Sequence, residues 1–479
     1  MAEPSAKKLG LLGLIGMVAG SMVGGGIFNL PQNMAAGAAA GAVIIAWVIT
    51  AFGMYFLANT FRTLSNARPD LSAGIYRYAQ EGFGRFIGFE VAWGYWLSSI
   101  FGNVAFAVLF MQALGYFFPI FGDGKNWPSV IGGSALIWGM HFLVLRGVSG
   151  AAMLNAIATG AKLIPLAVMA GFAIWAFQLP HFELDFWGEE AKLGDVGAQV
   201  KSTMLVTLWA FIGIEGAVVV SGRAKNPALV GQATLIGLFV CLSIYVLISV
   251  VPFGVMTQQE LGSLKDPSAS YVLKQIVGNW GAIFMNLGVL LALLSCWLSW
   301  TILVAEVPHE AAKDGVFPRA LAKANRFHSP APALWMSSLS MQATIFVVLF
   351  AEDAWLFLLQ ITGVMVLPPY LASCAYLWKL AGVNDGSSRI KKKCLAIFTG
   401  IMGTLYASWL LYAAGPGFLL MSSVLFATGI GVYWLAHRDR AEGEPLFVGH
   451  DNWLAIGLAF IAAVAILLMA TGLVSTGLS

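Results

Sequence analysis

Charged residues are scarce in this 479-residue chain. They make up 10% of the sequence, and 59% of the residues are hydrophobic, whereas a soluble domain usually carries about 25% charged residues. A soluble protein could not bury so much apolar surface around one core, but a bilayer accepts it as exterior. The composition therefore argues against a soluble domain and predicts an integral membrane protein.

Cysteines are few as well. Only four are present, scattered in or beside apolar runs with no paired spacing: Cys241, Cys296, Cys374 and Cys394. This distribution is typical of small core residues rather than of disulfides or metal ligands.

Motifs for catalysis or ATP hydrolysis are also missing. No glycine-rich loop ends in Gly-Lys-Ser/Thr, so the sequence predicts no phosphate-binding loop for ATP-driven transport. His309–Lys313 begins like a zinc-protease motif but lacks the second histidine, and no nucleophile–base pair appears. We therefore expect neither an enzyme nor a metal or cofactor site, and the basic loops beside the membrane need no nucleic acid to explain them.

What the sequence does contain is a series of apolar runs, each close to the roughly 20 residues that cross a bilayer. Hydropathy predicts thirteen spans: Leu9–Pro31, Gly41–Phe61, Phe86–Phe118, Ser129–Leu145, Ala151–Phe177, Met204–Val220, Gly231–Phe253, Gly281–Ala305, Leu334–Phe350, Trp355–Trp378, Leu395–Tyr412, Phe418–Ala436 and Trp453–Val474.

The distribution of basic residues predicts how these spans are oriented. With a cytoplasmic N-terminus, 20 of the 26 Lys and Arg residues fall in cytoplasmic segments, 5 outside and 1 within a span. This asymmetry is what the positive-inside rule requires. Thirteen spans then place the C-terminus outside the cytoplasm.

Two spans carry glycine clusters that favour a break in the helix. Residues 20–26 of the first span contain four glycines, and residues 209–216 of the sixth contain two glycines and a carboxylate. Each glycine costs a helix about 1 kcal/mol relative to alanine. Glycines that only allow close helix packing are the alternative for either cluster alone. Two breaks five spans apart instead predict two inverted five-helix repeats with a binding site at mid-membrane.

A broken helix offers chemistry that suits an amino acid. Freed N–H groups and a half-helix N-terminus can hold a carboxylate, and freed carbonyls can accept hydrogen bonds from an ammonium. An amino acid zwitterion needs both, which favours amino acids over sugars.

Two ionisable residues remain deep in the predicted spans, where a charge costs at least about 2.5–3.5 kcal/mol and so indicates function. Glu215 lies in the second glycine cluster and would attract cations or take up a proton that triggers gating; the alternative is a structural carboxylate held by backbone N–H groups. Lys162 would be a tethered cation that joins helices, or would extend toward an interface.

Aromatic residues on the surrounding spans could attract a cation. Tyr95, Trp96, Trp209 and Trp300 are the candidates, because an aromatic face attracts ammonium or guanidinium by about 0.5–2 kcal/mol. We single out Trp209, which adjoins a break, and Trp300. Most of the other tryptophans are expected in the core or the interfacial belts.

The motifs resemble a known superfamily. Gly20–Pro31 and Trp209–Gly216, with Ala92–Ser98, His141–Gly147 and Gly254–Gln258, resemble the amino acid–polyamine–organocation superfamily. Within it, the chain looks most like the bacterial arginine:ornithine antiporters of the basic amino acid/polyamine antiporter family. The resemblance implies an all-α membrane protein with a 5+5 inverted-repeat transporter fold, discontinuous helices 1 and 6, and about 13 transmembrane helices. The repeats would be residues 1–178 and 179–380, followed by helices 11–13 in 381–479.

The resemblance also implies residue roles. The residues that would clasp the substrate backbone are Ser21, Met22, Gly24, Gly25 and Gly26. The residues that would meet its distal cationic end are Ser98, Ser99, Asn103 and Thr362.

Further roles concern gating and coupling. Trp209 would be a middle gate, and Ile212 with Trp300 would sandwich the aliphatic stem of the substrate. Glu215 matches the family's gating carboxylate. Lys162 resembles a lysine that stands where sodium binds in sodium-coupled relatives, which implies sodium independence.

Two positions depart from the arginine/agmatine pattern of the family. Gly25 and Ala210 each stand where those relatives carry a serine, and the lost hydroxyls argue against agmatine as a substrate. The sequence therefore predicts one-for-one exchange of arginine for ornithine across the bacterial inner membrane by alternating access, with a homodimer left open. The alternatives are a proton-coupled importer of a cationic amino acid such as lysine or histidine, using Lys162 or Glu215, and an amino-acid sensor that does not transport.

Overall fold

The computed structural model describes residues 10–71, 75–147, 151–215, 226–383, 390, 392–439 and 445–474, with side chains omitted at 17, 151–161 and 227–228. Nine of the described helices are long and apolar enough to cross a membrane. They are α3 (Ala40–Ala67), α5 (Arg85–Gly115), α6 (Trp127–Leu145), α11 (Pro227–Val250), α14 (Asn279–Lys313), α15 (Ala331–Val347, extended by the 3₁₀ turn η7, Val348–Phe350), α16 (Ala354–Gly382), α17 (Lys393–Arg438) and α18 (Asp451–Ala470).

A tenth span is bent. It consists of α1 (Leu11–Met22), the 3₁₀ helix η1 (Gly25–Asn29) and α2 (Leu30–Ala35), with a bend of 51° between α1 and the following helical segment. The remaining expected spans correspond to α7 (Ala151–Trp175), to α9 (Val196–Phe211), and to α17, which holds two helices joined at a kink at Gly415. Every one of the thirteen predicted spans thus overlaps a helix, and the all-helical membrane fold is confirmed.

Several helices run past the predicted spans at one end of the bundle. α14 continues to Lys313 where hydropathy predicted an end at Ala305, and α3 continues to Ala67 rather than Phe61. Hydropathy detects only the apolar part of a helix. The helix can continue into polar sequence where polar side chains find hydrogen-bond partners. In α14, for example, Nδ1 of His309 lies 2.9 Å from the Leu321 carbonyl oxygen.

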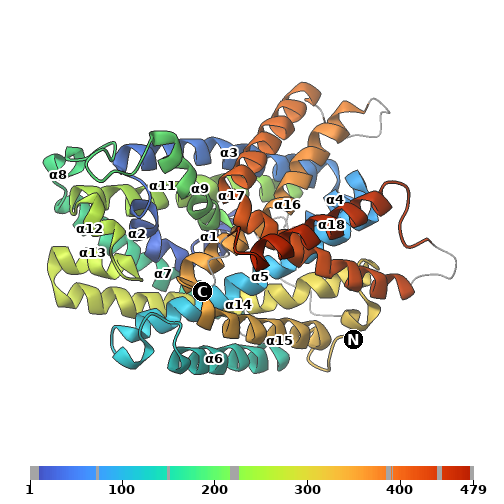
Figure 1. The fold of residues 1–479 in the computed structure, drawn as a ribbon, viewed down its shortest axis with the longest axis horizontal. Coiled ribbons are helices and arrows are strands. Elements are labelled where there is room, and N and C mark those ends of the chain that lie inside the picture. The colour runs from blue at the N-terminus through green and yellow to red at the C-terminus, as the bar shows by residue number, and fades with distance from the viewer. Residues whose placement is uncertain are drawn as a thin grey trace.

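The two ends of the bundle differ in charge and in structure. Short elements α8 (Leu179–Glu183), α12 (Gln258–Gly262) and α13 (Ser268–Val277) gather with α2 at one end, while α4 (Ile75–Phe83) lies at the other (Figure 1). We name the first the acidic end, because Asp123, Asp185 and Asp353 lie in its loops, and the second the basic end.

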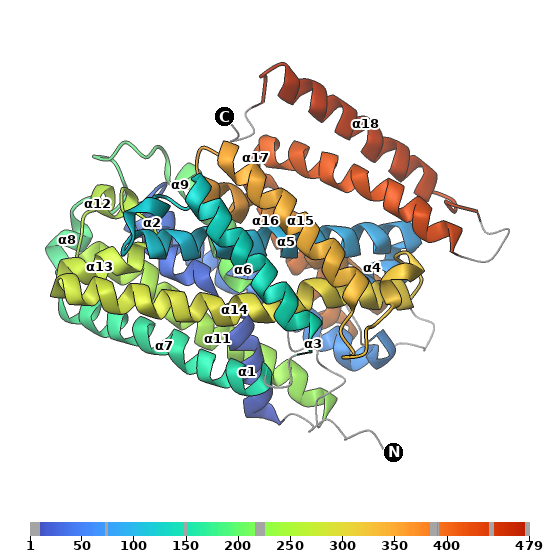
Figure 2. The same ribbon diagram turned by 90° about the horizontal axis from the view of Figure 1, so that it is seen from below.

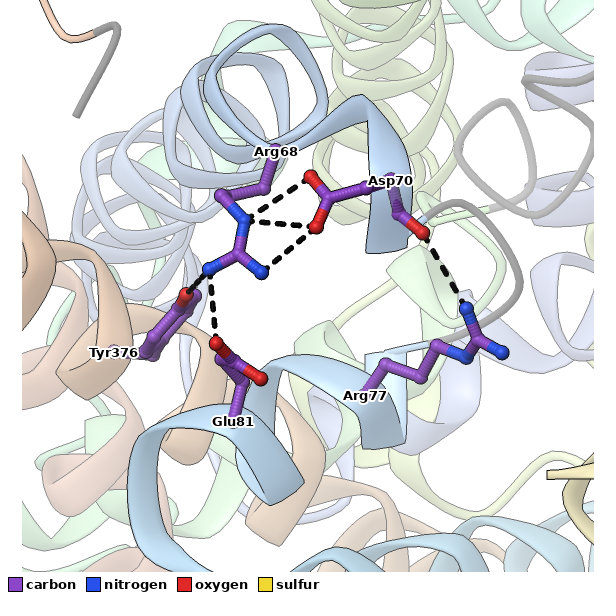
Figure 3. Close-up of polar contacts among 5 residues, drawn as sticks. All are labelled: Arg68, Asp70, Arg77, Glu81 and Tyr376. Carbon is purple, nitrogen blue, oxygen red and sulfur yellow. Dashed lines mark hydrogen bonds and ion pairs between the residues drawn. The ribbon is translucent and has the colours of Figure 1, made fainter. Parts of the chain in front are cut away.

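At the basic end, Arg68 joins three elements (Figure 3). Its guanidinium donates to both carboxylate oxygens of Asp70 at 2.8–3.1 Å, to Glu81 at 3.2 Å and to the hydroxyl of Tyr376 at 2.7 Å. Arg77 reaches the Asp70 carbonyl at 3.4 Å. These contacts fix α4 against the ends of α3 and α16.

The C-terminal helices lie outside this bundle. The second half of α17 and all of α18 form a pair at its periphery (Figure 2). Only 17% of the apolar window of α18 is buried, and Trp453 and Phe460 are 74% and 69% exposed. This apolar exterior is suited to lipid.

Candidate functional site

The first break lies in the middle of the first span. α1 ends at Met22, and helical hydrogen bonding resumes only in the 3₁₀ turns from Gly25. Between them, the Gly24 N–H donates to the Met22 carbonyl at 2.8 Å. The glycine cluster therefore interrupts the helix where the sequence predicted.

The second break begins where α9 ends, at Phe211. Residues 212–215 form turns, and Gly213 has a φ of +107°, a conformation that L side chains rarely adopt. The continuation through residues 216–225 lies outside the described residues.

The two breaks touch each other. Ser21 donates a hydrogen bond from Oγ to the Gly213 carbonyl at 2.9 Å. A Cβ on Gly213 would lie 3.0 Å from the backbone of Ser21, so only glycine fits without a shift. Segments 192 residues apart thus bring their non-helical backbone together inside the protein, where such backbone can survive at membrane depth.

A cavity of about 40 Å³ lies at this meeting point, and we call it the inner cavity. Its walls come from the two breaks and from α5, α11, α14 and α16. The lining residues are Ser21, Met22, Gly24, Gly26, Ile27, Ser98, Ser99, Gly102, Phe106, Trp209, Ala210, Ile212, Tyr245, Trp300 and Thr362.

Ten of the twelve residues predicted to bind substrate line the inner cavity, and two do not. Gly25 faces the other way, since a Cβ there would lie 2.3 Å from Leu293 Cδ2. Asn103 donates to the Ser99 carbonyl at 2.7 Å and accepts from Thr301 at 3.5 Å, so its amide is turned toward α14. For these two positions, the structure does not support direct contact with a ligand.

The tryptophan wall is tightly packed against the first break. A Cβ on Gly26 would lie 2.2 Å from Nε1 of Trp209, so the indole lies directly against the glycine backbone. On its other side, Trp209 meets Trp355 edge-on, with ring centroids 5.7 Å apart. The indole thus closes the inner cavity on the side of the acidic end, where α16 begins.

The opposite wall carries hydroxyl groups. Ser98 and Ser99 donate to the carbonyls of Thr362 and Tyr95, at 3.1 Å and 2.9 Å. The Oγ1 of Thr362 is buried and has no hydrogen-bond partner within the described part of the chain. Because such a group is costly to leave unpaired, it is suited to contact a polar ligand.

Glu215 lies on the side of the inner cavity that faces the basic end. Tyr95 on α5 donates to one carboxylate oxygen at 2.7 Å, and Tyr370 on α16 donates to the other at 2.8 Å. The Gly213 N–H adds a third bond at 3.2 Å. Three hydrogen bonds offset the cost of burying this carboxylate, and they tie α5 and α16 to the second break.

Comparison with known proteins identifies the family. The amino acid permease family model matches residues 9–436. The chain belongs to the amino acid permease family of the amino acid–polyamine–organocation superfamily. Its members are transporters, so this permease is a multi-pass membrane transporter and not an enzyme.

Individual relatives resemble the permease over its whole length. The arginine/agmatine antiporters of Chlamydia pneumoniae and Chlamydia caviae are each 50% identical to it, over 478 and 474 residues, and 98% of both chains is covered in each case. A putative amino-acid transporter of Clostridium perfringens is 46% identical over 470 residues, or 96% of the permease and 98% of the relative.

Lys162 of the permease supports the first break. Its ammonium is buried and donates to the Gly20 carbonyl at 3.2 Å, in the last turn of α1 before the break. The side chain therefore joins α7 to α1 rather than extending to an interface.

Sequence reasoning missed four of the lining residues: Ile27, Gly102, Phe106 and Tyr245. Gly102 and Phe106 follow Ser99 at i+3 and i+7, so helical periodicity places them on the face of Ser99, although it places Asn103, at i+4, there equally well. Tyr245 lies on an unbroken helix with no local signal. Tyr95 and Trp96, expected near the cation, instead bind Glu215 and Ser337.

Proposed function

We propose that this permease is an antiporter that exchanges arginine for a second cationic substrate across the bacterial inner membrane by alternating access. The inner cavity is the observation that carries the proposal. It brings together the non-helical backbone of the two breaks, the indole of Trp209 and the unpaired hydroxyl of Thr362. On the side that faces the basic end, it adjoins Glu215 and its tyrosine partners. The relatives named for arginine and agmatine support the same substrate class.

Each part of arginine has a counterpart in the inner cavity. The α-carboxylate and α-ammonium would bind at the backbone of Gly24 and Gly26. Trp300 would cover the aliphatic stem and attract the cationic end, and Thr362 would accept a hydrogen bond from the guanidinium. A cavity of about 40 Å³ has room for only about three waters, so the walls must separate to admit a substrate, with Trp209 as the part that moves.

Glu215 supports the gate in this proposal. Its bonds to Tyr95 and Tyr370 hold α5 and α16 together on the path from the inner cavity to the basic end. Opening toward that end requires those bonds to break. The two five-helix repeats, residues 1–178 and 179–380, would move against each other while helices 11–13 in 381–479 remain peripheral.

The charge asymmetry supports a cytoplasmic basic end. Arg68, Arg77 and Lys379 lie there, and the positive-inside rule places such residues in the cytoplasm. The N-terminus is then cytoplasmic and the C-terminus is outside. Lys162, whose ammonium occupies the Gly20 carbonyl, supports transport that does not depend on sodium.

The structure weakens one argument about the counter-substrate. The sequence argued against agmatine because Gly25 and Ala210 lack hydroxyls. Gly25, however, faces Leu293 rather than the inner cavity, so only Ala210 still carries that argument. Together with the names of the relatives, this leads us to place agmatine first as the counter-substrate, with ornithine as the second candidate on the strength of Ala210.

Counterflow in reconstituted vesicles tests the proposal. Vesicles preloaded with agmatine or ornithine should take up labelled arginine, and empty vesicles should not. Equal uptake into empty vesicles would count against obligatory exchange. Net accumulation driven by a pH gradient would instead identify a proton-coupled importer, and saturable binding without counterflow would identify a sensor. A panel of arginine, ornithine, lysine, histidine, agmatine and putrescine would then rank the substrates.

A further inference from the structure

A second and larger cavity lies at the acidic end. It has a volume of about 430 Å³, and we call it the outer cavity. Six charged residues line it: Asp123, Lys125, Lys265, Asp266, Glu352 and Asp353. Four carboxylates against two lysines give a net charge of −2 when all are ionised. A concave surface of one sign concentrates ions of the opposite sign.

One of the two lysines is already engaged. Lys125 donates to the backbone carbonyls of Ala351 and Glu352 at 3.1 Å and 2.7 Å, so its ammonium is anchored to the main chain. Lys265 is exposed at the rim. Both lysines keep their charge, so the negative sign of the outer cavity comes from the excess of carboxylates over lysines in its lining.

Two buried acceptors in the lining have no donor. Oδ1 of Asp266 and Oε1 of Gln112 are both buried without a hydrogen-bond partner in the part of the protein described. Leaving each unpaired costs about 1–3 kcal/mol, more for the charged group. These two acceptors, on different elements of one cavity, are available to a ligand rich in N–H donors.

The charge of Asp266 is itself unfavourable in the empty cavity. Burial, and then repulsion by Asp353 and Asp123, raise the pKa of the Asp266 carboxyl well above its usual range. A bound cation would relieve both effects and restore the ionised form.

The geometry favours an organic cation over a metal ion. Within the described ranges, only Glu306, His309 and Glu310 bring three metal-type ligand atoms within 4.8 Å of one another. No three of the described carboxylates that line the outer cavity come that close together, so the cavity lacks the cluster of acidic ligands that would favour a metal ion. The lining also includes Tyr116 and Tyr271, whose rings meet edge-on at 6.4 Å and offer aromatic faces to an ammonium or guanidinium.

The two cavities are stacked along the same helices. On α5, Gln112 of the outer cavity is six residues beyond Phe106 of the inner one, about 9 Å along the axis. On α16, Ala354 of the outer cavity is eight residues before Thr362 of the inner one, about 12 Å. Trp355, next to Ala354, contacts Trp209, so this pair of indoles lies between the cavities.

We propose that the outer cavity is a second, weaker binding site, at which a substrate bearing a guanidinium or ammonium group is held by Asp266 and Gln112 before it passes the Trp209–Trp355 pair. This inference rests on the proposed function for the identity of its ligand. It adds a site whose selectivity is for positive charge, whereas the inner cavity recognises the whole molecule.

Transport kinetics from the acidic-end side test the site. Asp266→Asn should raise the KM for arginine about 3- to 10-fold at low ionic strength, with little change in kcat, because it removes attraction without altering the inner cavity. Lys265→Gln, which removes a positive charge at the rim, should lower the KM. Glu189→Gln is the matched control, since it neutralises an exposed acid at the same end that does not line the outer cavity.

The opposite results would overturn the proposal. One such result is an equal change in the KM for arginine in Asp266→Asn and Glu189→Gln. Another is a KM change in Asp266→Asn that is the same whether arginine is added from one side of the membrane or the other. The proposed function would survive either result if arginine exchange persisted.

A binding measurement tests the outer cavity without transport. In purified Trp300→Ala protein, ligand-detected NMR should find weak saturable binding of arginine and of guanidinium that Asp266→Asn abolishes and Glu189→Gln retains. That result would support the outer cavity even if no arginine exchange were found. Loss of Ca²⁺ binding in Asp266→Asn without loss of guanidinium binding would identify a metal site and overturn the proposal.

Discussion

Tyr370 and Glu215 lie 155 residues apart in the sequence and are joined by a hydrogen bond of 2.8 Å. Together with the hydrogen bond from Tyr95, this bond ties Glu215 to α5 and α16 on the side of the inner cavity that faces the basic end. Glu215 is the only acidic residue among these three side chains. Replacing it with glutamine, which has nearly the same size, changes their hydrogen bonding and leaves their packing almost unchanged.

We expect Glu215→Gln to reduce the maximal rate of exchange more than it changes the KM. The amide nitrogen of glutamine cannot accept a hydrogen bond from a tyrosine hydroxyl, and a bond to a charged group contributes about 1.5–3 kcal/mol, or roughly 10- to 100-fold in the gating equilibrium. Initial exchange rates in proteoliposomes measure this. Tyr370→Phe, which removes one donor and keeps the charge, should cause a smaller loss in the same direction. A fully active Glu215→Gln would remove the gating role.

Trp300→Ala should weaken arginine binding by about 10-fold or more, because it removes both an apolar wall and an aromatic face for the cation. Isothermal titration calorimetry on purified protein measures the affinity. Trp453→Ala is the control, since Trp453 is 74% exposed on α18 and should leave binding unchanged. Equal losses in the two variants would show that the effect is not specific to the inner cavity.

Gly26→Ala should impair binding, since its methyl group would lie 2.2 Å from the Trp209 indole and displace it. We expect at least a 10-fold loss of affinity in a binding titration. Gly16→Ala, on α1 with no atom within 4 Å of the added carbon, should bind normally and melt at the same or a higher temperature, because alanine favours a helix by about 1 kcal/mol. Normal binding by Gly26→Ala would show that the close contact between Gly26 and the Trp209 indole is not needed for binding.

Ala210→Ser should increase exchange with agmatine relative to ornithine by about 3-fold, because it adds a hydroxyl to the wall of the inner cavity. Gly25→Ser should give no such gain, since its side chain would meet Leu293. Counterflow with mixed internal substrates measures the ratio. A gain in Gly25→Ser alone would show that this position reaches the substrate after all.

Asp314→Asn should loosen α4 and lower the melting temperature of the purified protein. Burial alone would raise the pKa of Asp314, but hydrogen bonds from Arg77 and Tyr76 outweigh it and hold that pKa below its usual value. The ion pair therefore stabilises the fold above about pH 4 and loses this effect as pH falls through the lowered pKa. We expect a cost of about 1–2 kcal/mol at neutral pH.

A double-mutant cycle with Arg77→Gln checks the assignment, because the two changes should not add. Glu310→Gln is the control; it breaks an exposed pair with Lys313 and should have little effect. Additive losses in the cycle would place the stabilising role of Asp314 outside its contact with Arg77.

The sequence predicted the two breaks because glycine acts locally, through the backbone of the residue itself. It did not predict all the lining residues of the inner cavity, because whether a helical residue lines it depends on how the helices pack against each other. Asn103 and Gly102 are neighbours on α5, and only the packing against α14 decides that Gly102 lines the inner cavity while Asn103 turns away. Tyr245 was missed for the same reason, since it enters the site from a helix with no irregularity.

The tight closure of the inner cavity has a consequence for energy conservation in the cell. If the empty carrier is most stable in this compact closed state, it would reopen slowly on the other side of the membrane. Reorientation of the carrier would then require a bound substrate. The flux of one substrate down its gradient would then be strictly coupled to the flux of the other. The empty carrier would add no uncoupled movement of charged substrate across the membrane.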